Sequence, residues 1–101
     1  MQPNPIRTVE TFVWRGVRSR VTVVRNYRIE GWTQLDVQVV APLRAPLPFA
    51  IDGYRREGFE QQVIDAAGGL APFLTAWAER DAVTPGYAAA VARWKQGDLF
   101  R

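Results

Sequence analysis

Three prolines within seven residues divide the sequence into two halves of different character. Pro42, Pro46 and Pro48 all fall in the segment 41–48. Proline lacks an amide hydrogen and fixes φ, so neither a helix interior nor a central strand runs through such a segment. We therefore expect a stiff, extended connector that ends the sheet before it. With 101 residues in total, both halves belong to one domain by the usual size range.

The half before the connector has the composition of β-strands. Segments 8–14, 20–27 and 32–40 are rich in β-branched and aromatic residues, and Gly16 and Gly31 interrupt them. The last segment alternates, which places Leu35, Val37 and Val39 on one face and polar residues on the other. These patterns predict an antiparallel meander of three strands with one buried face.

The second strand leaves its own orientation open. Either Val21 and Val23 point into the core, or Thr22 and Val24 do, because both pairs are compatible with burial. A shift of one residue would move every side chain of the strand to the other face. The sequence therefore does not decide which arginines share the polar face.

The residues directly after the connector carry turn signals rather than a strand pattern. Asp52-Gly53 is a strong turn dipeptide, and Gly58 adds a second interruption in the segment 49–59. We interpret this segment as a loop. Tyr54, Arg55 and Arg56 on such a loop either grip a phosphate or a base, or pack on the sheet and face water.

The remaining residues have helical periodicity. Segment 60–67 predicts a short helix stopped by two glycines, and an apolar stripe predicts a helix over 70–81. Thr84-Pro85 is a typical helix start, and Gly97 predicts that the last helix ends near residues 95–96. The fold class expected is α+β, a three-stranded antiparallel β-meander followed by two or three helices packed on one face.

The chain contains no cysteine and no histidine, which excludes several classes of chemistry. Thiolate metal sites, disulfides and the usual nucleophile–histidine pairs are all impossible without these residues. Asp36-Val37-Gln38 resembles half of a nuclease motif, but the chain's single lysine, Lys95, lies far from it. We therefore expect a non-enzymatic protein without a cofactor or a metal.

Arginine accounts for the positive charge of the chain. The net charge is +3, with twelve arginines against one lysine, and the first thirty residues hold six arginines and two glutamates. Such a cluster either neutralises the phosphates of DNA or RNA or forms a solvated basic face. The candidate nucleic-acid-binding residues are Arg15, Arg18, Arg20, Arg25, Arg28, Arg55 and Arg56.

The C-terminal residues Gln96-Gly97-Asp98-Leu99-Phe100 resemble the short peptide with which bacterial clamp-binding proteins enter the sliding clamp. The resemblance assigns partner binding to Gln96, Asp98, Leu99 and Phe100, with the last two as apolar anchors. Glycine at 97, where such peptides usually have leucine, weakens the match. Alternatively, Gly97 caps the helix, and Leu99 or Phe100 folds back onto the preceding turn.

The order Ala45-Pro46-Leu47-Pro48, Gly53-Tyr54-Arg55, Gly68-Gly69 and Ala76-Trp77, with the Leu-Phe end, is similar to small uncharacterised proteins of α-proteobacterial genomes and plasmids. This resemblance implies a link to replication or a mobile element. The small size of the chain and its lack of catalytic groups also permit a phage- or plasmid-encoded inhibitor of a host nucleic-acid enzyme.

The domain organisation expected is a flexible lead-in at 1–7, one α+β domain at 8–95 and a peptide tail at 96–101. No segment has the signature of a membrane span or a signal peptide, so we expect a cytoplasmic protein with no membrane partner. The oligomeric state is left open.

Overall fold

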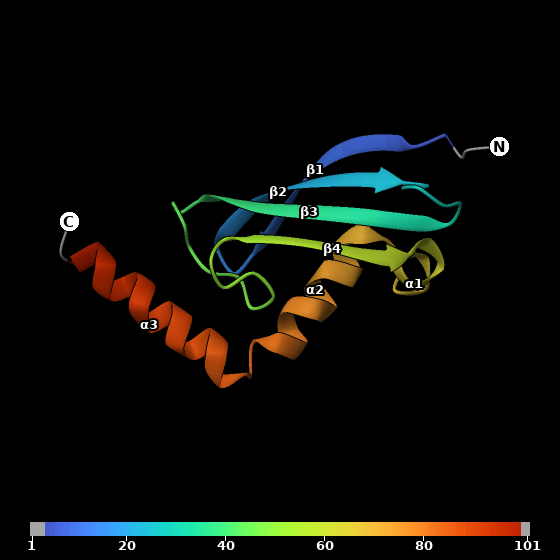
Figure 1. The fold of residues 1–101 in the computed structure, drawn as a ribbon. Coiled ribbons are helices and arrows are strands. Elements are labelled where there is room, and N and C mark those ends of the chain that lie inside the picture. The colour runs from blue at the N-terminus through green and yellow to red at the C-terminus, as the bar shows by residue number, and fades with distance from the viewer. Residues whose placement is uncertain (1–3, 100–101) are drawn as a thin grey trace.

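A computed structural model describes residues 4–99 of the chain, and Figure 1 shows its arrangement as four strands followed by three helices. The elements are β1 (Ile6–Trp14), β2 (Val17–Arg25), β3 (Trp32–Ala41), β4 (Tyr54–Glu60), α1 (Gln61–Ala66), α2 (Leu70–Asp81) and α3 (Pro85–Leu99). The α+β class and the antiparallel sheet expected from the sequence are confirmed. The strand count is corrected from three to four.

The fourth strand occupies residues that the turn signals had assigned to a loop. The sheet order is β1-β2-β3-β4, and β4 pairs antiparallel with β3, with Thr33 opposite Phe59. Asp52-Gly53 does form a turn, and Gly53 has a φ of 86°. Gly58, however, lies inside the strand, where it faces Trp32 instead of breaking the pairing. The prediction failed because it treated both glycines alike.

The orientation that the sequence left open for β2 is settled by burial. Val21 and Val23 are buried, so they point toward the core, and the residues between them point to the opposite face. The strand starts directly after a two-residue turn, Arg15-Gly16, in which both residues have positive φ. Such a turn matches the right-handed twist of a hairpin and fixes the β1–β2 register.

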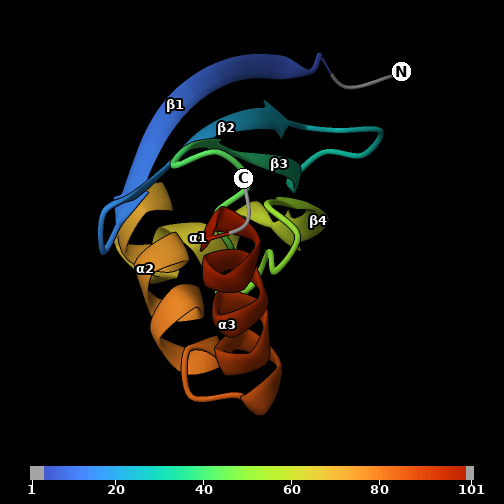
Figure 2. The same ribbon diagram turned by 90° about the vertical axis from the view of Figure 1, so that its left-hand side faces the viewer.

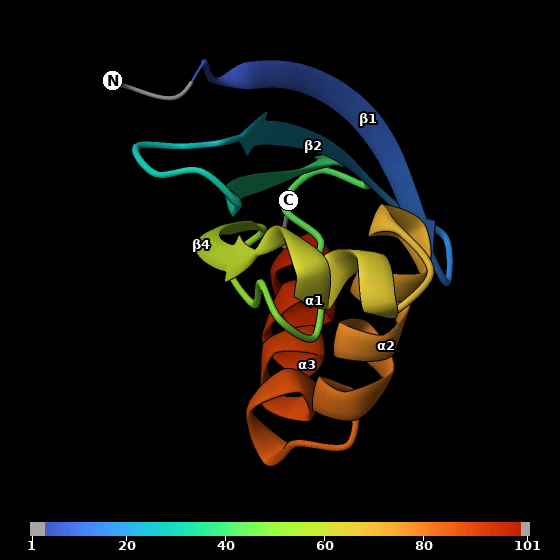
Figure 3. The ribbon, with the colours of Figure 1, turned by 90° about the vertical axis from the view of Figure 1, so that its right-hand side faces the viewer.

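All three helices lie on one side of the curved sheet, as Figures 2 and 3 show from opposite directions. The core is therefore a single layer between the sheet and the helices. Its buried apolar side chains are Phe12, Trp14, Val21, Val23, Leu35, Val37, Val39, Ala45, Leu47, Phe49, Ala50, Ile64, Leu74, Trp77 and Ala78. The proline connector contributes to this core, so it does more than link the two halves.

Helix α2 has the bounds that its apolar stripe predicts, and Leu74 and Trp77 on that stripe are buried. The indole of Trp77 stacks on Phe49 with 4.3 Å between ring centroids and meets Phe59 edge-on at 5.2 Å. Aromatic contacts of this kind add about 0.5–1.5 kcal/mol each beyond the area they bury. The helix thereby fastens the connector and β4 to the same core.

Helix α3 begins where Thr84-Pro85 predicts, and the Thr84 hydroxyl accepts a hydrogen bond from the Tyr87 amide at 3.4 Å. The indole of Trp94 donates to the Leu43 carbonyl at 3.1 Å, which ties the helix to the connector. Its far end was predicted wrongly. The helix continues through Gly97 to Leu99, so Gly97 is not the cap.

The predicted boundaries after residue 7 and after residue 95 both fall inside regular elements. Strand β1 begins at Ile6, so the last two residues of the predicted lead-in belong to the sheet. The predicted tail, 96–101, is helical as far as Leu99, whereas residues 1–3 and 100–101 lie outside the described residues. Within residues 4–99, no helix combines the length and the apolar character needed to cross a membrane.

Candidate nucleic-acid interface

The sheet has one surface that the helices leave uncovered, and we call it the open face. Because Val21, Val23, Leu35 and Val37 are buried on the helix side, the residues that alternate with them point outward. The open face consists of Arg7, Val9, Thr11 and Val13 on β1, Arg18, Arg20, Thr22 and Val24 on β2, Trp32, Gln34, Asp36, Gln38 and Val40 on β3, and Tyr54, Arg56, Gly58 and Glu60 on β4.

Four of these outward-pointing residues are arginines on three different strands. The strand register places Arg20 between Thr11 on β1 and Gln38 on β3, in the middle of the face. The ion pairs found within residues 4–99 do not involve Arg7, Arg18 or Arg20. These three guanidinium groups therefore have their charge available to a ligand.

One carboxylate, Asp36, lies in the centre of the open face and holds two neighbours from β4. The Tyr54 hydroxyl donates to Asp36 Oδ2 at 3.1 Å, and Arg56 Nε lies 4.0 Å from the same oxygen. Desolvation, and next the hydrogen bond to Asp36, raise the pKa of Tyr54 above its ordinary value of 10.0. Tyr54 thus stays a neutral donor and keeps its ring fixed on the face.

The other four arginines proposed from the sequence lie elsewhere. Arg15 pairs with Glu79 at 2.7 Å, and Arg28 lies over the ring of Tyr27 in the β2–β3 turn. Arg55 points to the helix side, where it binds Glu57 through two nitrogens and lies over Trp77. Arg25 lines a small cavity of about 40 Å³ at the helix side of β2.

The structure therefore brings together Arg18, Arg20 and Arg56 and separates the rest. Sequence reasoning missed Arg7, which it had placed in a flexible lead-in before the first strand. The alternation of β1 could have identified Arg7, because side chains two residues apart on a strand point to the same face and Arg7 is two residues before Val9.

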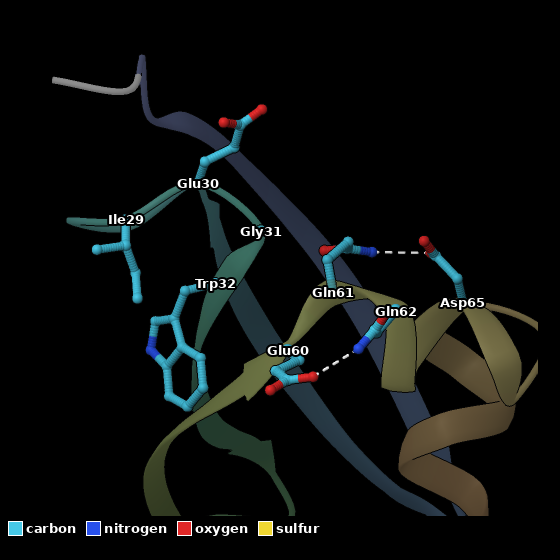
Figure 4. Close-up of a pocket in the computed structure, with 8 residues that line it drawn as sticks. All are labelled: Ile29, Glu30, Gly31, Trp32, Glu60, Gln61, Gln62 and Asp65. Atoms are coloured by element: carbon cyan, nitrogen blue, oxygen red, sulfur yellow. Dashed lines mark hydrogen bonds between the residues drawn. The ribbon is translucent and has the colours of Figure 1, made fainter. Parts of the chain in front are cut away.

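A cavity of about 520 Å³ lies at the opposite end of the sheet from the Arg15-Gly16 turn, where the β2–β3 turn meets α1 (Figure 4). Its walls carry Glu30, Glu60 and Asp65 beside the indole of Trp32. Gln62 donates to Glu60 at 2.7 Å, and Gln61 donates to Asp65 at 2.9 Å. The two amides thus already satisfy one oxygen of each carboxylate.

A second cavity, of about 510 Å³, lies between the connector and the start of α3. Its walls include Phe49, Tyr54, Arg55, Asp81 and Tyr87. Burial raises the pKa of the Tyr87 hydroxyl, against a smaller opposing effect of Arg15. The arginine in the walls of this cavity, Arg55, forms an ion pair with Glu57. The cavity therefore lacks an unpaired arginine such as those on the open face.

Within residues 4–99, no group of three carboxylates, histidines or cysteines is close enough to hold a metal ion. The clustered chemistry of the open face is cationic and hydrogen-bonding: guanidinium groups, amides and hydroxyls. Such groups bind anions with many oxygen atoms, among which phosphates are the commonest in macromolecules.

The peptide-like C-terminal residues are only partly described. Gln96 and Gly97 are exposed in the last turns of α3, and the backbone of Asp98 and Leu99 continues the helix. Phe100, one of the two proposed apolar anchors, lies outside the described residues. Glycine 97 has nothing within 4 Å of the position that a Cβ would take.

A family model described as the KlcB third domain matches residues 7–87, from the second residue of β1 to the first turn of α3. No curated protein matches the chain. No solved structure matches it either.

Proposed function

The chain belongs to the KlcB third-domain family, which is associated with plasmids, and we propose that it binds nucleic acid on the open face of its sheet. The observation that carries this proposal is the placement of Arg7, Arg18, Arg20 and Arg56 on one uncovered surface. Only Asp36 and, at the end of β4, Glu60 oppose them there. The family match covers every strand that forms this surface.

Two of the arginines are spaced like successive phosphates of a single strand. Arg18 and Arg20 are alternate residues of β2 and lie about 6.7 Å apart. Arg7 on β1 lies four residues further along the sheet than Arg20, and Arg56 lies two strands away on β4, so each is about 12–14 Å from Arg20. A nucleic-acid strand that binds Arg18 and Arg20 can therefore reach Arg7 or Arg56 about two phosphates further on. A guanidinium binds a phosphate through two parallel hydrogen bonds, which favours arginine over lysine here.

Bases have two kinds of partner on the same surface. The Tyr54 ring is 42% exposed and is held by Asp36, so it offers a stacking surface of fixed orientation. Gln34 alternates with Asp36 along β3 and presents an amide that can donate and accept. The Gln38 nitrogen already donates to the Gly53 carbonyl at 3.4 Å, so this side chain offers its oxygen as an acceptor. We therefore propose single-stranded nucleic acid as the preferred form, since its bases are accessible to a sheet.

The experiment compares two double variants that lose the same charge. Arg18→Ala/Arg20→Ala removes two arginines from the open face, whereas Arg80→Ala/Arg93→Ala removes two exposed arginines from α2 and α3. Fluorescence anisotropy with labelled single-stranded and duplex oligonucleotides measures the affinity of each. We expect the open-face variant to lose at least about tenfold in affinity, because each phosphate contact contributes to binding.

The matched variant on the helices is expected to bind within about twofold of the original protein, since two distant charges act mainly through a screened field. Equal losses in both double variants would show that net charge, rather than this surface, attracts nucleic acid. Absence of binding at low salt to any oligonucleotide would refute the proposed function.

A second candidate is the clamp-binding role of the C-terminal peptide. It is favoured by the exposure of Lys95, Gln96 and Gly97 in the last turns of α3. The C-terminal end of this helix lies at one extreme of the molecule (Figure 1). A peptide of this kind binds in an extended form, so the last turn of α3 would have to unwind first. Gly97 makes that unwinding easier, because glycine disfavours a helix by about 1 kcal/mol relative to alanine.

This candidate predicts opposite effects of one substitution on folding and binding. Gly97→Ala should raise the helicity of α3 in circular dichroism and weaken binding to purified sliding clamp several-fold in calorimetry. Gly86→Ala, in the first turn of the same helix, serves as the control. If Gly97→Ala binds the clamp more tightly, or if deletion of residues 99–101 leaves binding unchanged, the peptide does not act as proposed.

A further inference from the structure

Strand β1 forms one edge of the sheet and pairs with β2 on one side only. Figures 2 and 3 show it as the long outer strand, with the helices below its C-terminal end. Unpaired strand edges present a row of amide and carbonyl groups that can pair with another strand. The edge of β1, which is 9 residues long, can therefore pair with a partner strand of similar length.

The hairpin turn shows which backbone groups of β1 face outward. In a hairpin with a two-residue turn such as Arg15-Gly16, the flanking pair Trp14–Val17 exchanges both hydrogen bonds. Hydrogen-bonded and non-hydrogen-bonded pairs then alternate along the strands. The amides and carbonyls that point away from β2 consequently belong to Arg7, Val9, Thr11 and Val13.

The same edge exposes apolar side chains on a strand that is rich in β-branched residues. Ile6 is 53% exposed and Val9 is 58% exposed. Residues 6–14 contain no Pro and no Lys, and their one charged side chain on the helix side, Glu10, is exposed rather than buried. We propose that β1 pairs antiparallel with β1 of a second copy of this chain, about a two-fold axis through Val9.

Side-chain complementarity selects this register among the possible ones. With Val9 opposite Val9 of the second copy, Arg7 lies opposite Thr11, Thr8 opposite Glu10, and Ile6 opposite Phe12. Apolar residues then meet apolar residues, and no like charges are directly opposite. Two copies of β1 in antiparallel orientation thus place compatible side chains opposite each other.

The neighbouring registers are less favourable because they place like charges, or an apolar and a charged side chain, opposite each other. Moving the axis to Glu10 places two glutamates directly opposite each other, and moving it to Thr8 places Ile6 against Glu10. Moving it to Thr11 brings Arg7 against Arg15. A heterologous strand would not need this self-complementarity, so a second copy is the occupant that fits.

The symmetry of the pairing has a consequence for the open face. A two-fold axis perpendicular to the sheet leaves the open faces of both copies on the same side. The result is a continuous sheet of eight strands whose outward surface carries both sets of arginines. The pairing does not depend on nucleic-acid binding, and it can be tested without it.

Because the chain has no cysteine, single-cysteine variants report the register directly. Val9→Cys places two cysteines opposite each other across the axis, about 5.5 Å apart between Cα atoms, which suits a disulfide. Thr11→Cys lies on the same strand and the same face, but its two copies would be about 13 Å apart. We expect mild oxidation to give a covalent dimer with Val9→Cys and none with Thr11→Cys.

Light scattering coupled to size exclusion measures the pairing without a cross-link. We expect the unmodified chain to show a dimer whose fraction rises with concentration, and Val9→Lys to be a monomer with an unchanged circular dichroism spectrum. A monomeric unmodified chain at every concentration would overturn the proposal. So would equal cross-linking of Val9→Cys and Thr11→Cys, or a dimer that survives in Val9→Lys.

Discussion

Gly58 shows how a single missing side chain shapes the open face. A Cβ at this position would lie 2.6 Å from the indole nitrogen of Trp32, so the glycine allows the indole to lie directly on β4. An aromatic ring over a strand glycine recovers packing that the glycine itself cannot supply. The residue that looked like a turn signal is therefore part of a cross-strand contact.

This contact predicts the effect of substitution at Gly58. We expect Gly58→Val to lower the free energy of unfolding by about 1–3 kcal/mol, because the added atoms must displace the indole. Chemical denaturation measures this loss. In a Trp32→Ala background the same substitution should cost at least about 0.5 kcal/mol less, and equal costs in both backgrounds would disprove the contact.

Tyr54 predicts a specific dependence of stability on alkaline pH. Its pKa in the folded protein is raised above 10.0, chiefly by desolvation and then by the bond to Asp36. The folded chain therefore holds this proton longer than the unfolded chain, so stability is retained below pH 10 and falls as pH rises beyond it. Tyr54→Phe should lose less stability than the original chain between about pH 9 and about pH 11, as measured by denaturant midpoints.

At the scale of elements, Leu74 on α2 is fully buried between the helix and the sheet. We expect Leu74→Ala to lower the free energy of unfolding by about 2–5 kcal/mol, because it leaves a cavity in the only layer of core. Leu43→Ala is the matched control, since Leu43 is 62% exposed in the connector and should change stability little. Similar losses for both variants would contradict the role assigned to α2.

The elements that sequence reasoning predicted well are those with strong local signals. Helix α2 has an apolar stripe, and α3 has Thr84-Pro85 at its start, so both begin where expected. Strand β4 was missed because two of its residues on the helix side, Arg55 and Glu57, are charged and form an ion pair with each other. The strand therefore lacks the alternation of apolar and polar residues by which strands are recognised in a sequence. Residues 54–60 form a strand because they pair with β3, and this long-range pairing cannot be seen in the local sequence.

The end of α3 illustrates the opposite error. Gly97 is the residue type most often found just after a helix, yet the helix passes through it to Leu99. The position is exposed and has space for a side chain, so the structure there imposes no requirement for glycine. The presence of a glycine alone therefore does not predict where a helix ends.

At the scale of the whole molecule, sequence reasoning found the basic character of the chain but could not assemble its surface. Arg18, Arg20 and Arg56 come together only because β2 adopts one of two orientations and because β4 exists. Arg55 is adjacent to Arg56 in sequence but points to the other face. Counting arginines gave seven candidates, whereas the sheet register selects three of them and adds Arg7.

The salt dependence of nucleic-acid affinity tests the central claim most directly. If the three unpaired arginines of the open face, Arg7, Arg18 and Arg20, neutralise phosphates of a single strand, the slope of log K against log salt should be about −2. Arg18→Ala/Arg20→Ala should reduce its magnitude by about 1.4, while Arg80→Ala/Arg93→Ala leaves the slope unchanged. A slope near zero, or one that the open-face variant leaves intact, would contradict the account.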